Sequence, residues 1–228
     1  MIPFSPKAAA DYDVRIPRLV PGYDLVQDLA ASLLGAELGP QARIFVAGCG
    51  TGFEIAHLAR THAGWLFTGL DPSAAMLDKA RERLDKLDMT ARAIWVEAAL
   101  GEVAAPSGDH LPHAGAHDAA LAFLVDHFVP DDGSRLRFLE ALAQSVQPGA
   151  PVLLFHQDAS GFEPAYVQWL RAQGHDGTSA QAVLTRIRKL WFPLPPERLA
   201  TLLQEAGLKE EGTFFRSLSY RGLIARRL

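Results

Sequence analysis

The sequence has a single cysteine, Cys49, and no long run of apolar residues. One cysteine excludes an internal disulfide and a metal site built from cysteines. No apolar run approaches the roughly 18 residues of a membrane-spanning helix, and residues 1–4 show no basic flank before an apolar signal core. We therefore expect a cytoplasmic protein without a membrane segment. With 49% hydrophobic and 21% charged residues, the 228-residue chain suits one folded domain with a sizeable core.

An excess of positive charge is also missing, because the formal net charge is −4. That balance gives no overall attraction to nucleic acid, so we expect no nucleic-acid partner. Positive charge gathers locally in two clusters: Arg186, Arg188, Lys189 and Arg198, and Arg216, Arg221, Arg226 and Arg227. Such clusters are most often solvated helix faces or a charged edge strand. Their best functional use is to bind an anionic small substrate.

Two common nucleotide-binding patterns are absent from the glycine-rich segment 48–52. A dinucleotide fingerprint needs Gly-x-Gly-x-x-Gly, but Phe53 stands at the third glycine position, and no Gly-Lys-Ser/Thr follows, as a P-loop requires. What is present is an apolar run, 43–47, that leads into alternating glycines and then a helix. A second apolar run, 65–70, ends at Asp71, whose carboxylate can accept hydrogen bonds from both ribose hydroxyls. The combination predicts a nucleoside-binding site.

This arrangement resembles motif I and the following acidic loop of class I S-adenosylmethionine-dependent methyltransferases. Residues 71–77, 117–123 and 147–155 look like the family's acidic loop and helix, its fourth strand and the turn into its fifth strand. Residues 202–208 look like the helix end and glycine cap before the sixth strand. The resemblance implies an α/β, Rossmann-like doubly wound sheet of seven strands, mostly parallel with an antiparallel last strand and helices on both faces. It also implies S-adenosyl-L-methionine as the cofactor.

The resemblance further assigns residues to the cofactor. The glycine turn and Asp71 would face the ribose, the segment 98–100 the adenine, and the end of the fourth strand the sulfonium. Tyr23 would cover the cofactor from the N-terminal segment. The predicted cofactor-binding residues are Tyr23, Gly48, Cys49, Gly50, Gly52, Asp71, Pro72, Met76, Ala98, Ala99, Leu100, Phe123 and Leu124.

Two positions depart from the family pattern. Val46 stands where the family usually carries an acid that orients the glycine loop and the methionine amine. Ala98 and Ala99 stand where many members have an acid for the adenine amino group. Amine recognition must then come from the backbone or from elsewhere, and adenine would be held by backbone amides and apolar packing. The sequence leaves open whether these positions weaken or alter cofactor recognition.

Apolar runs alternate with helical periodicity along the chain, as in a parallel, doubly wound sheet. We expect strands at about 43–47, 65–70, 92–97, 118–123, 151–156, 209–216 and 218–226. Helices are expected at 53–61, 74–87, 134–146 and 197–206, with one or two more within 160–190. The predicted units are an N-terminal helical lid, 1–40, and a class I methyltransferase domain, 41–228, with a helical insertion at about 160–190.

The N-terminal string 16–23, Ile-Pro-Arg-Leu-Val-Pro-Gly-Tyr, is similar to a stretch of carboxy-S-adenosylmethionine synthases, as residues 214–218 are to their final hairpin. Those enzymes share the methyltransferase fold and convert the methyl donor into a carboxymethyl donor. Such a synthase needs an arginine in the inserted helix to pair with the added carboxylate. An ungapped count places Leu184 there, and Arg186 or Arg188 would match only with a small shift of register.

Methyl transfer needs orientation, a dry site and, for an acidic nucleophile, a base. His127, a few residues after the fourth strand, is the first candidate for that base, and His156, at the end of the fifth, is the second. A packed histidine is the ordinary alternative for His127. His110 and His113 lie in a loop whose spacing could in principle bind a metal, but loop histidines are usually solvated, so we predict no metal.

Three functions remain open. The favoured one is an S-adenosylmethionine-dependent methyltransferase that acts on a small molecule by in-line transfer. The alternatives are a carboxy-S-adenosylmethionine synthase-like enzyme acting on the cofactor, and a non-catalytic S-adenosylmethionine-binding scaffold whose crevice is closed by Val46 and Ala98. The sequence gives neither the methyl acceptor nor the accepting atom, and it leaves open a homodimer formed through an exposed final strand.

Overall fold

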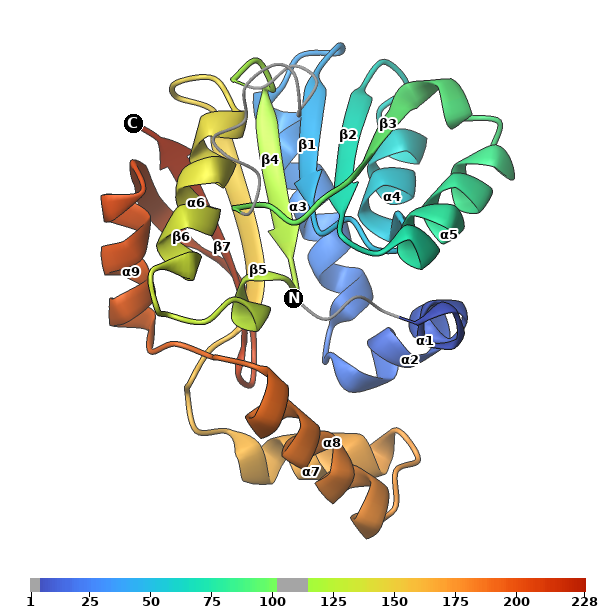
Figure 1. Ribbon diagram of the computed structural model, residues 1–228, viewed down its shortest axis with the longest axis vertical. Coiled ribbons are helices and arrows are strands. Elements are labelled where there is room, and N and C mark those ends of the chain that lie inside the picture. Colours follow the sequence, from blue (N-terminus) through green and yellow to red (C-terminus); the bar gives the residue numbers. More distant parts are fainter. Residues whose placement is uncertain (1–4, 102–114) are drawn as a thin grey trace.

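The computed structural model describes residues 5–101 and 115–228, which form a seven-stranded sheet flanked by helices (Figure 1). The strand order is β3-β2-β1-β4-β5-β7-β6; β1 to β5 run parallel, and β7 is antiparallel to both of its neighbours. The predicted Rossmann-like fold is confirmed. The strands are β1 (Arg43–Ala47), β2 (Leu66–Asp71), β3 (Ala93–Glu97), β4 (Ala119–Phe123), β5 (Pro151–Gln157), β6 (Leu208–Ser217) and β7 (Tyr220–Arg227).

Helices cover both faces of the sheet. Buried side chains of α3, α4 and α5 pack on one face and those of α6 and α9 on the other. The α-helices are α1 (Pro6–Ala10), α2 (Tyr12–Leu19), α3 (Tyr23–Glu37), α4 (Phe53–Thr61), α5 (Ala74–Asp85), α6 (Ser134–Ser145), α7 (Glu163–Ala172), α8 (Gly177–Leu190) and α9 (Pro196–Glu205). Two short 3-10 helices are η1 (Thr90–Arg92) and η2 (Asp126–Phe128).

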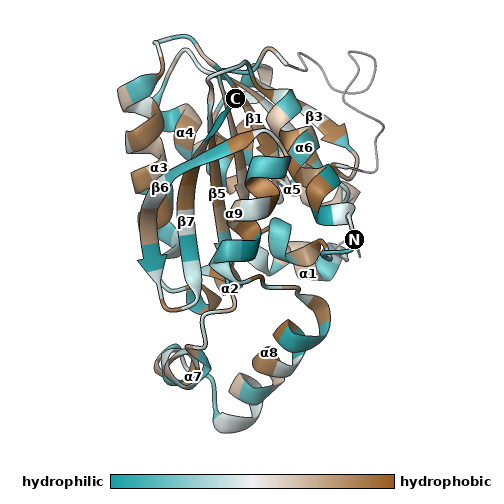
Figure 2. Cartoon of the chain, turned by 90° about the vertical axis from the view of Figure 1, so that its left-hand side faces the viewer, coloured by the Kyte–Doolittle hydropathy of each residue, from teal (hydrophilic) through white to brown (hydrophobic). Residues whose placement is uncertain are grey.

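The central strands are apolar along their whole length because both of their faces are covered. Ile44 and Val46 of β1 belong to the core on one side of the sheet, whereas Phe45 and Ala47 belong to the core on the other. Figure 2 shows the same feature as hydrophobic strands between helices whose outer faces are hydrophilic. The continuous apolar runs in the sequence therefore reflect burial on two sides.

The strand order reverses between β1 and β4, and ligands of open α/β sheets bind beyond the carboxyl ends of the strands at such a point. The helices α1, α2, α7 and α8 lie at this end of the sheet (Figure 1). The expected helical insertion thus forms two helices, α7 and α8. Within the predicted lid 1–40, α3 instead packs on the sheet core through Val26, Ala30 and Leu34.

The position of the last strand corrects one expectation. We expected the final strand to be exposed, but β7 lies between β5 and β6, and the edge of the sheet is β6. β7 pairs with β5 from Pro151 to Gln157 and with β6 in a hairpin. Its buried side chains Leu223 and Ala225 complete the core under α6 and α9, which explains why this strand occupies the inner position.

Candidate cofactor and acceptor cavity

The glycine loop between β1 and α4 depends on backbone conformations that favour glycine. Gly48, Gly50 and Gly52 have positive φ angles of 63°, 50° and 72°. A Cβ on Gly48 would lie 2.3 Å from Val125 Cγ2, whereas a Cβ on Gly50 would have no atom within 4 Å. Gly48 is therefore required for packing, while Gly50 leaves an open cradle at the backbone, as a nucleoside site needs.

Asp71, the last residue of β2, fixes this loop. Its Oδ2 accepts a hydrogen bond from the backbone N–H of Gly50 at 3.0 Å, and its Oδ1 accepts one from the N–H of Ser73 at 2.9 Å. Burial raises the pKa of the Asp71 carboxyl, and these two hydrogen bonds oppose that rise. Each carboxylate oxygen accepts more than one hydrogen bond, so capacity remains for ribose hydroxyls.

A cavity of about 770 Å³ opens beside this loop, at the carboxyl ends of β1, β2 and β4. Seven of the predicted cofactor residues line it: Gly48, Gly50, Asp71, Pro72, Met76, Phe123 and Leu124. We call this part the cofactor half of the cavity. The structure thus brings together residues from three strand ends that the sequence analysis assigned to one site.

The other predicted cofactor residues do not line the cavity. Cys49, within the loop, is buried, and Gly52 packs closely on α5, where a Cβ would lie 2.9 Å from Ala80 Cβ. Tyr23 is buried on α3. The segment 98–100 follows β3, with the N–H of Ala98 donating to the carbonyl of Asp71 at 3.2 Å. These residues support the loop and its neighbours in the structure, and their contact with a cofactor stays a prediction.

The cavity continues from the cofactor half under α2, α7 and α8, and we call this second part the acceptor half. Its walls are apolar and aromatic. The lining comprises Tyr12, Ile16, Leu19, Phe128, Tyr166, Val183, Ile187, Leu190, Trp191 and Phe192. Hydrogen bonds hold α7 against the end of α2: Tyr166 Oη donates to the carbonyl of Leu19 at 2.8 Å and Trp169 Nε1 to that of Arg18 at 3.0 Å.

Three cations also line the acceptor half: Arg15 on α2, and Arg186 and Lys189 on α8. None of them has an ion-pair partner within the described part of the chain. Neighbouring arginines differ, because Arg188 pairs with Glu163 and Arg198 with Asp131. In the second basic cluster, three arginines form ion pairs with carboxylates of the chain. Arg216 pairs with Asp158, Arg221 with Glu210, and Arg226 with Glu37 and Glu211.

Comparison with known proteins agrees with the fold and with the resemblance to methyltransferases. Residues 45–152 match a family model described as a methyltransferase domain. The carboxy-S-adenosyl-L-methionine synthase of Klebsiella pneumoniae (strain 342) is 22% identical over 233 residues, which cover 97% of this chain and 90% of that protein. The resemblance to such synthases thus extends beyond the N-terminal string.

Solved structures agree in fold. A CurJ carbon methyltransferase superposes with a TM-score of 0.70 at 14% identity, covering 98% of this chain and 61% of that one. For a mitomycin 7-O-methyltransferase the TM-score is 0.64 at 19% identity, with coverage of 90% and 54%, so the chain spans little more than half of that protein.

The chain has the Rossmann-like fold of these methyltransferases. The predicted resemblance and fold are confirmed, and the cofactor of the class that the chain resembles is S-adenosylmethionine.

His127, the first candidate base, lies on η2 at the cavity wall and is fully buried. Its ring stacks on Trp191 with centroids 4.2 Å apart. Nδ1 accepts the backbone N–H of Gln157 at 3.4 Å, and Nε2 has no partner within the described residues. Burial lowers the pKa of His127 to about 3, so the ring is neutral at neutral pH. Because Nδ1 accepts, the proton of the neutral ring sits on Nε2.

His156, the second candidate base, does not line the cavity. It is buried in β5, and its Nδ1 lies 3.7 Å from Asp126 Oδ2. The same Asp126 oxygen is 3.7 Å from a guanidinium nitrogen of buried Arg135. Burial lowers the pKa of His156, so it too favours the neutral form. The assignment of either histidine as a base remains a prediction.

The candidate metal ligands His110 and His113 lie outside the described residues. The next histidine along the chain, His117, is buried. Its Nδ1 contacts the Ser145 carbonyl at 2.8 Å, and its Nε2 contacts the Thr68 hydroxyl at 3.0 Å. Within 5–101 and 115–228, no three His, Cys, Asp or Glu side chains are grouped as a metal site. Over the same ranges, no helix has the length and apolar character to cross a bilayer.

Sequence reasoning missed most of the acceptor half. The signal was present as helical spacing, because Tyr12, Ile16 and Leu19 on α2 recur at i, i+4 and i+7. Val183, Ile187 and Leu190 on α8 repeat the same spacing. Each of these two sets of residues, taken alone, indicates an ordinary packing face of a helix. Only the packing of α2 near α7 and α8 turns the two sets into opposite walls of one cavity.

Proposed function

We propose that this chain binds S-adenosylmethionine in the cofactor half of the cavity and transfers its methyl group to a small molecule in the acceptor half. One observation carries the proposal: a single cavity of about 770 Å³ contains both the glycine loop with Asp71 and an apolar chamber walled by α2 and α8. Its volume falls in the range of ligand sites for small molecules. An acceptor enclosed there would lie next to the cofactor.

The residues present suit this cofactor. The open cradle at Gly50 admits a ligand against the backbone, and the carboxylate of Asp71 would accept hydrogen bonds from the ribose hydroxyls. Phe123 and Leu124, at the end of β4, would face the sulfonium, as the family resemblance implies. When bound, the cofactor supplies a methyl group on a positively charged sulfur. The protein's contribution is then orientation and exclusion of water by the apolar walls.

His127 would contribute by hydrogen bonding rather than by removing a proton. Its Nε2 carries the proton in the neutral ring, so it can donate to an oxygen of the acceptor once Trp191 gives access. A base at this position would instead require a free lone pair on Nε2. The rate of methyl transfer against pH tests the difference, because a base role for His127 or His156 predicts an ionisation that disappears in the His→Gln variant.

The acceptor that best fits the chamber is an anion with an apolar body. The lining is aromatic and aliphatic, while Arg15, Arg186 and Lys189 supply positive charge that no carboxylate of the described residues neutralises. Guanidinium and ammonium groups bind carboxylates and phosphates through charge-assisted hydrogen bonds. We therefore propose a compact carboxylate, phosphate or phenolate as the methyl acceptor.

A second function, conversion of the cofactor by a carboxy-S-adenosylmethionine synthase-like reaction, is favoured by one observation. Arg186 of the inserted helix α8 lines the cavity, as the arginine of that reaction should, whereas Arg188 faces Glu163. Similarity to such a synthase along 97% of the chain agrees with this second function. A scaffold with a closed crevice has less support, because Val46 is buried in the core and Ala98 does not line the cavity.

The deciding experiment is mass spectrometry of small molecules released from the purified, denatured protein, together with thermal shifts on adding S-adenosylmethionine or S-adenosylhomocysteine. Release of either compound, or a clear stabilisation, supports the methyltransferase and justifies a screen of anionic acceptors against their uncharged counterparts. A carboxylated analogue of the cofactor would favour the synthase. No nucleoside and no stabilisation would contradict both.

A further inference from the structure

The side chains that line the cavity differ systematically in charge and in exposure. Among the described residues of the lining, five are exposed to solvent, and we call them the rim of the cavity: Ser5, Arg15, Arg186, Lys189 and Phe192. Three of these five are cations. Every other residue of the lining is apolar or neutral except Asp71, which is a buried acid. The positive charge of the lining therefore lies at its solvent end and not in its interior.

The cations of the rim stand on both walls of the acceptor half. Arg186 and Lys189 are three residues apart on α8, so their side chains share one face of that helix. Phe192, which is 43% exposed, follows them just beyond the end of α8. Arg15 lies on α2, which forms the opposite wall. Because no carboxylate of the described residues pairs with these three cations, the rim presents positive charge on two sides of an opening that is partly apolar.

The interior of the acceptor half does not suit an anion. Its buried lining includes the side chains of Ile16, Tyr166 and Ile187, and the one charged group among the buried lining residues, Asp71, is itself an acid. An anion placed there would lose its hydration without gaining a counter-ion, which is costly. The accepting atom, in contrast, has to reach the cofactor beside Phe123 and Leu124. The anionic group and the accepting atom of a ligand are thus favoured at opposite ends of the acceptor half.

We propose that the methyl acceptor carries a carboxylate or phosphate group remote from the atom that is methylated, and that Arg15, Arg186 and Lys189 bind this group at the rim. The inference rests on the proposed function and deepens it, because it gives the anionic group a place and a purpose. The group anchors one end of the acceptor, the apolar body fills the chamber, and the accepting atom points to the cofactor half. A phenolate is disfavoured, because its charge sits on its own nucleophilic oxygen.

Two probes of the same shape separate the effect of charge from that of apolar burial. The probe 4-phenylbutyrate ends in a carboxylate, whereas 4-phenylbutyramide ends in a neutral amide. Each is titrated by calorimetry into wild-type protein that is saturated with S-adenosylhomocysteine. Phenylbutyrate should bind about 10- to 30-fold more tightly than phenylbutyramide at low salt. This preference should shrink several-fold between about 0.05 and 0.5 M salt, because exposed charges are screened.

The double variant Arg186→Gln/Lys189→Gln tests the rim directly. It should bind the two probes within about threefold of each other, because only Arg15 remains. Its affinity for S-adenosylhomocysteine should equal that of wild type, which also shows that the variant is folded. The control is Arg188→Gln/Arg198→Gln, which removes as much positive charge from side chains that pair with Glu163 and Asp131 and do not line the cavity. The control should keep the full preference for phenylbutyrate.

The ionisation of bound phenylbutyrate shows at which end of the chamber its carboxyl group lies. Nearby cations lower the pKa of a carboxyl group, whereas burial in an apolar interior that contains an acid raises it. Carbon-13 NMR of the carboxyl-labelled probe, bound to the protein with S-adenosylhomocysteine and titrated between about pH 8 and about pH 5, follows this ionisation. We expect the bound carboxyl group to be less protonated than the free one at each pH.

The outcomes separate this inference from the proposed function. If wild-type protein binds both probes equally, or if the control loses the preference as the rim variant does, the role of the rim is wrong while the cofactor site stands. A pKa of the bound probe above that of the free probe would place its carboxyl group in the interior and overturn the inference.

Two results with S-adenosylhomocysteine complete the test. Weaker binding of this ligand to the rim variant would mean that the cations serve the carboxylate of the cofactor, and the inference would be wrong. If wild-type protein does not bind S-adenosylhomocysteine at all, the proposed function itself is wrong, and the role of the rim is wrong with it.

Discussion

Two glycines of the same loop serve different purposes, which single substitutions can separate. Gly48→Ala would place its methyl group 2.3 Å from Val125 Cγ2 at a positive φ, so we expect it to lower the free energy of unfolding by roughly 3 kcal/mol. Gly50→Ala meets no atom within 4 Å and should cost only about 1 kcal/mol, yet its methyl group would occupy the cavity. Urea unfolding measures the first effect and S-adenosylhomocysteine titration the second.

The opposite results would contradict the packing role of Gly48 and the ligand-binding role of Gly50. A Gly48→Ala protein as stable as wild type would mean that η2 moves away from the loop at little cost. A Gly50→Ala protein with unchanged affinity for S-adenosylhomocysteine would mean that the backbone does not approach the ligand at this position.

His127 links stability to pH because folding lowers its pKa from the ordinary 6.5 to about 3. Between these values the unfolded chain binds more protons than the native one, so stability must fall as the pH falls from 6.5 towards 3. The expected loss by pH 4.5 is about 2 to 3 kcal/mol. We expect His127→Gln to flatten this slope in urea unfolding curves, while His175→Gln, a half-buried histidine on the α7–α8 turn, should leave it unchanged. An equal slope in both variants would place the acid sensitivity elsewhere.

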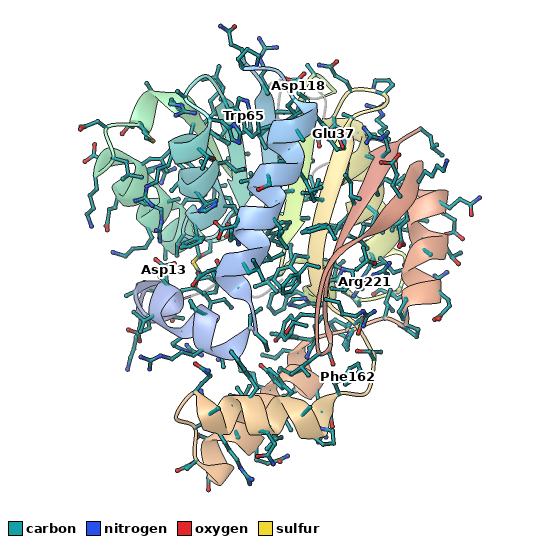
Figure 3. The ribbon with its side chains drawn as sticks, turned by 180° about the vertical axis from the view of Figure 1, so that it is seen from behind. Asp13, Glu37, Trp65, Asp118, Phe162 and Arg221 are labelled. Carbon is teal, nitrogen blue, oxygen red and sulfur yellow. The ribbon has the colours of Figure 1, made fainter. Side chains whose placement is uncertain are left out.

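At the scale of elements, hydrogen bonds and an ion pair at its two ends hold α2 in the wall of the cavity. At its start Asp13, labelled in Figure 3, accepts from the Thr51 hydroxyl at 2.6 Å and pairs with Arg83 of α5. At its end the carbonyls of Arg18 and Leu19 accept from α7. The helix therefore covers the cavity with polar contacts at its two ends and with Ile16, packed in the core, between them.

Asp13→Asn should loosen this closure. Because the Asp13–Arg83 pair is partly exposed, its loss should cost no more than about 1 kcal/mol of global stability. Hydrogen exchange of the α2 amides should become faster, and S-adenosylhomocysteine should both bind and dissociate faster. Glu82→Gln, which removes an exposed pair with Lys79 next to Arg83 on α5, is the control and should change neither. Equal exchange in both variants would show that α7 alone holds α2.

The helix α8 presents two arginines, two residues apart in the sequence, in different surroundings. Arg186 lines the cavity, whereas Arg188 pairs with Glu163. We expect Arg186→Gln to weaken binding of the anionic dye anilinonaphthalene sulfonate about tenfold, because one charged hydrogen bond is lost. Phenylnaphthylamine, the uncharged counterpart of that dye, should bind equally to Arg186→Gln and to wild type. The Arg188→Gln variant should bind both dyes like wild type. If Arg188→Gln weakens the anionic dye as much as Arg186→Gln, general surface charge explains the binding.

At the scale of the whole molecule, the edge of the sheet bears on oligomeric state. The edge strand is β6, which carries charged residues and two irregularities of register against β7, at Glu210/Gly212 and Thr213/Phe215. Bulges and charges hinder pairing of one edge with another. We expect a monomer of about 24.8 kDa by light scattering after gel filtration. Twice that mass would require an interface other than a continuous sheet.

The fold and half of the site followed from local sequence. The strand before Gly48, the glycine turn after it and the strand that ends at Asp71 each depend on residues a few positions apart, and the structure has all of them. The final strand was predicted as a strand but placed wrongly, because its position in the sheet depends on which partner covers its apolar face.

The sequence by itself determined the parallel sheet, the glycine loop and Asp71, because continuous apolar runs and turn residues act over short distances along the chain. Only the tertiary structure decided the acceptor half and the cations that line it. Tyr166 and Leu19, which help close the cavity, are 147 residues apart. Such contacts depend on how helices pack on the sheet and on each other, and helical spacing alone does not say which two faces will meet.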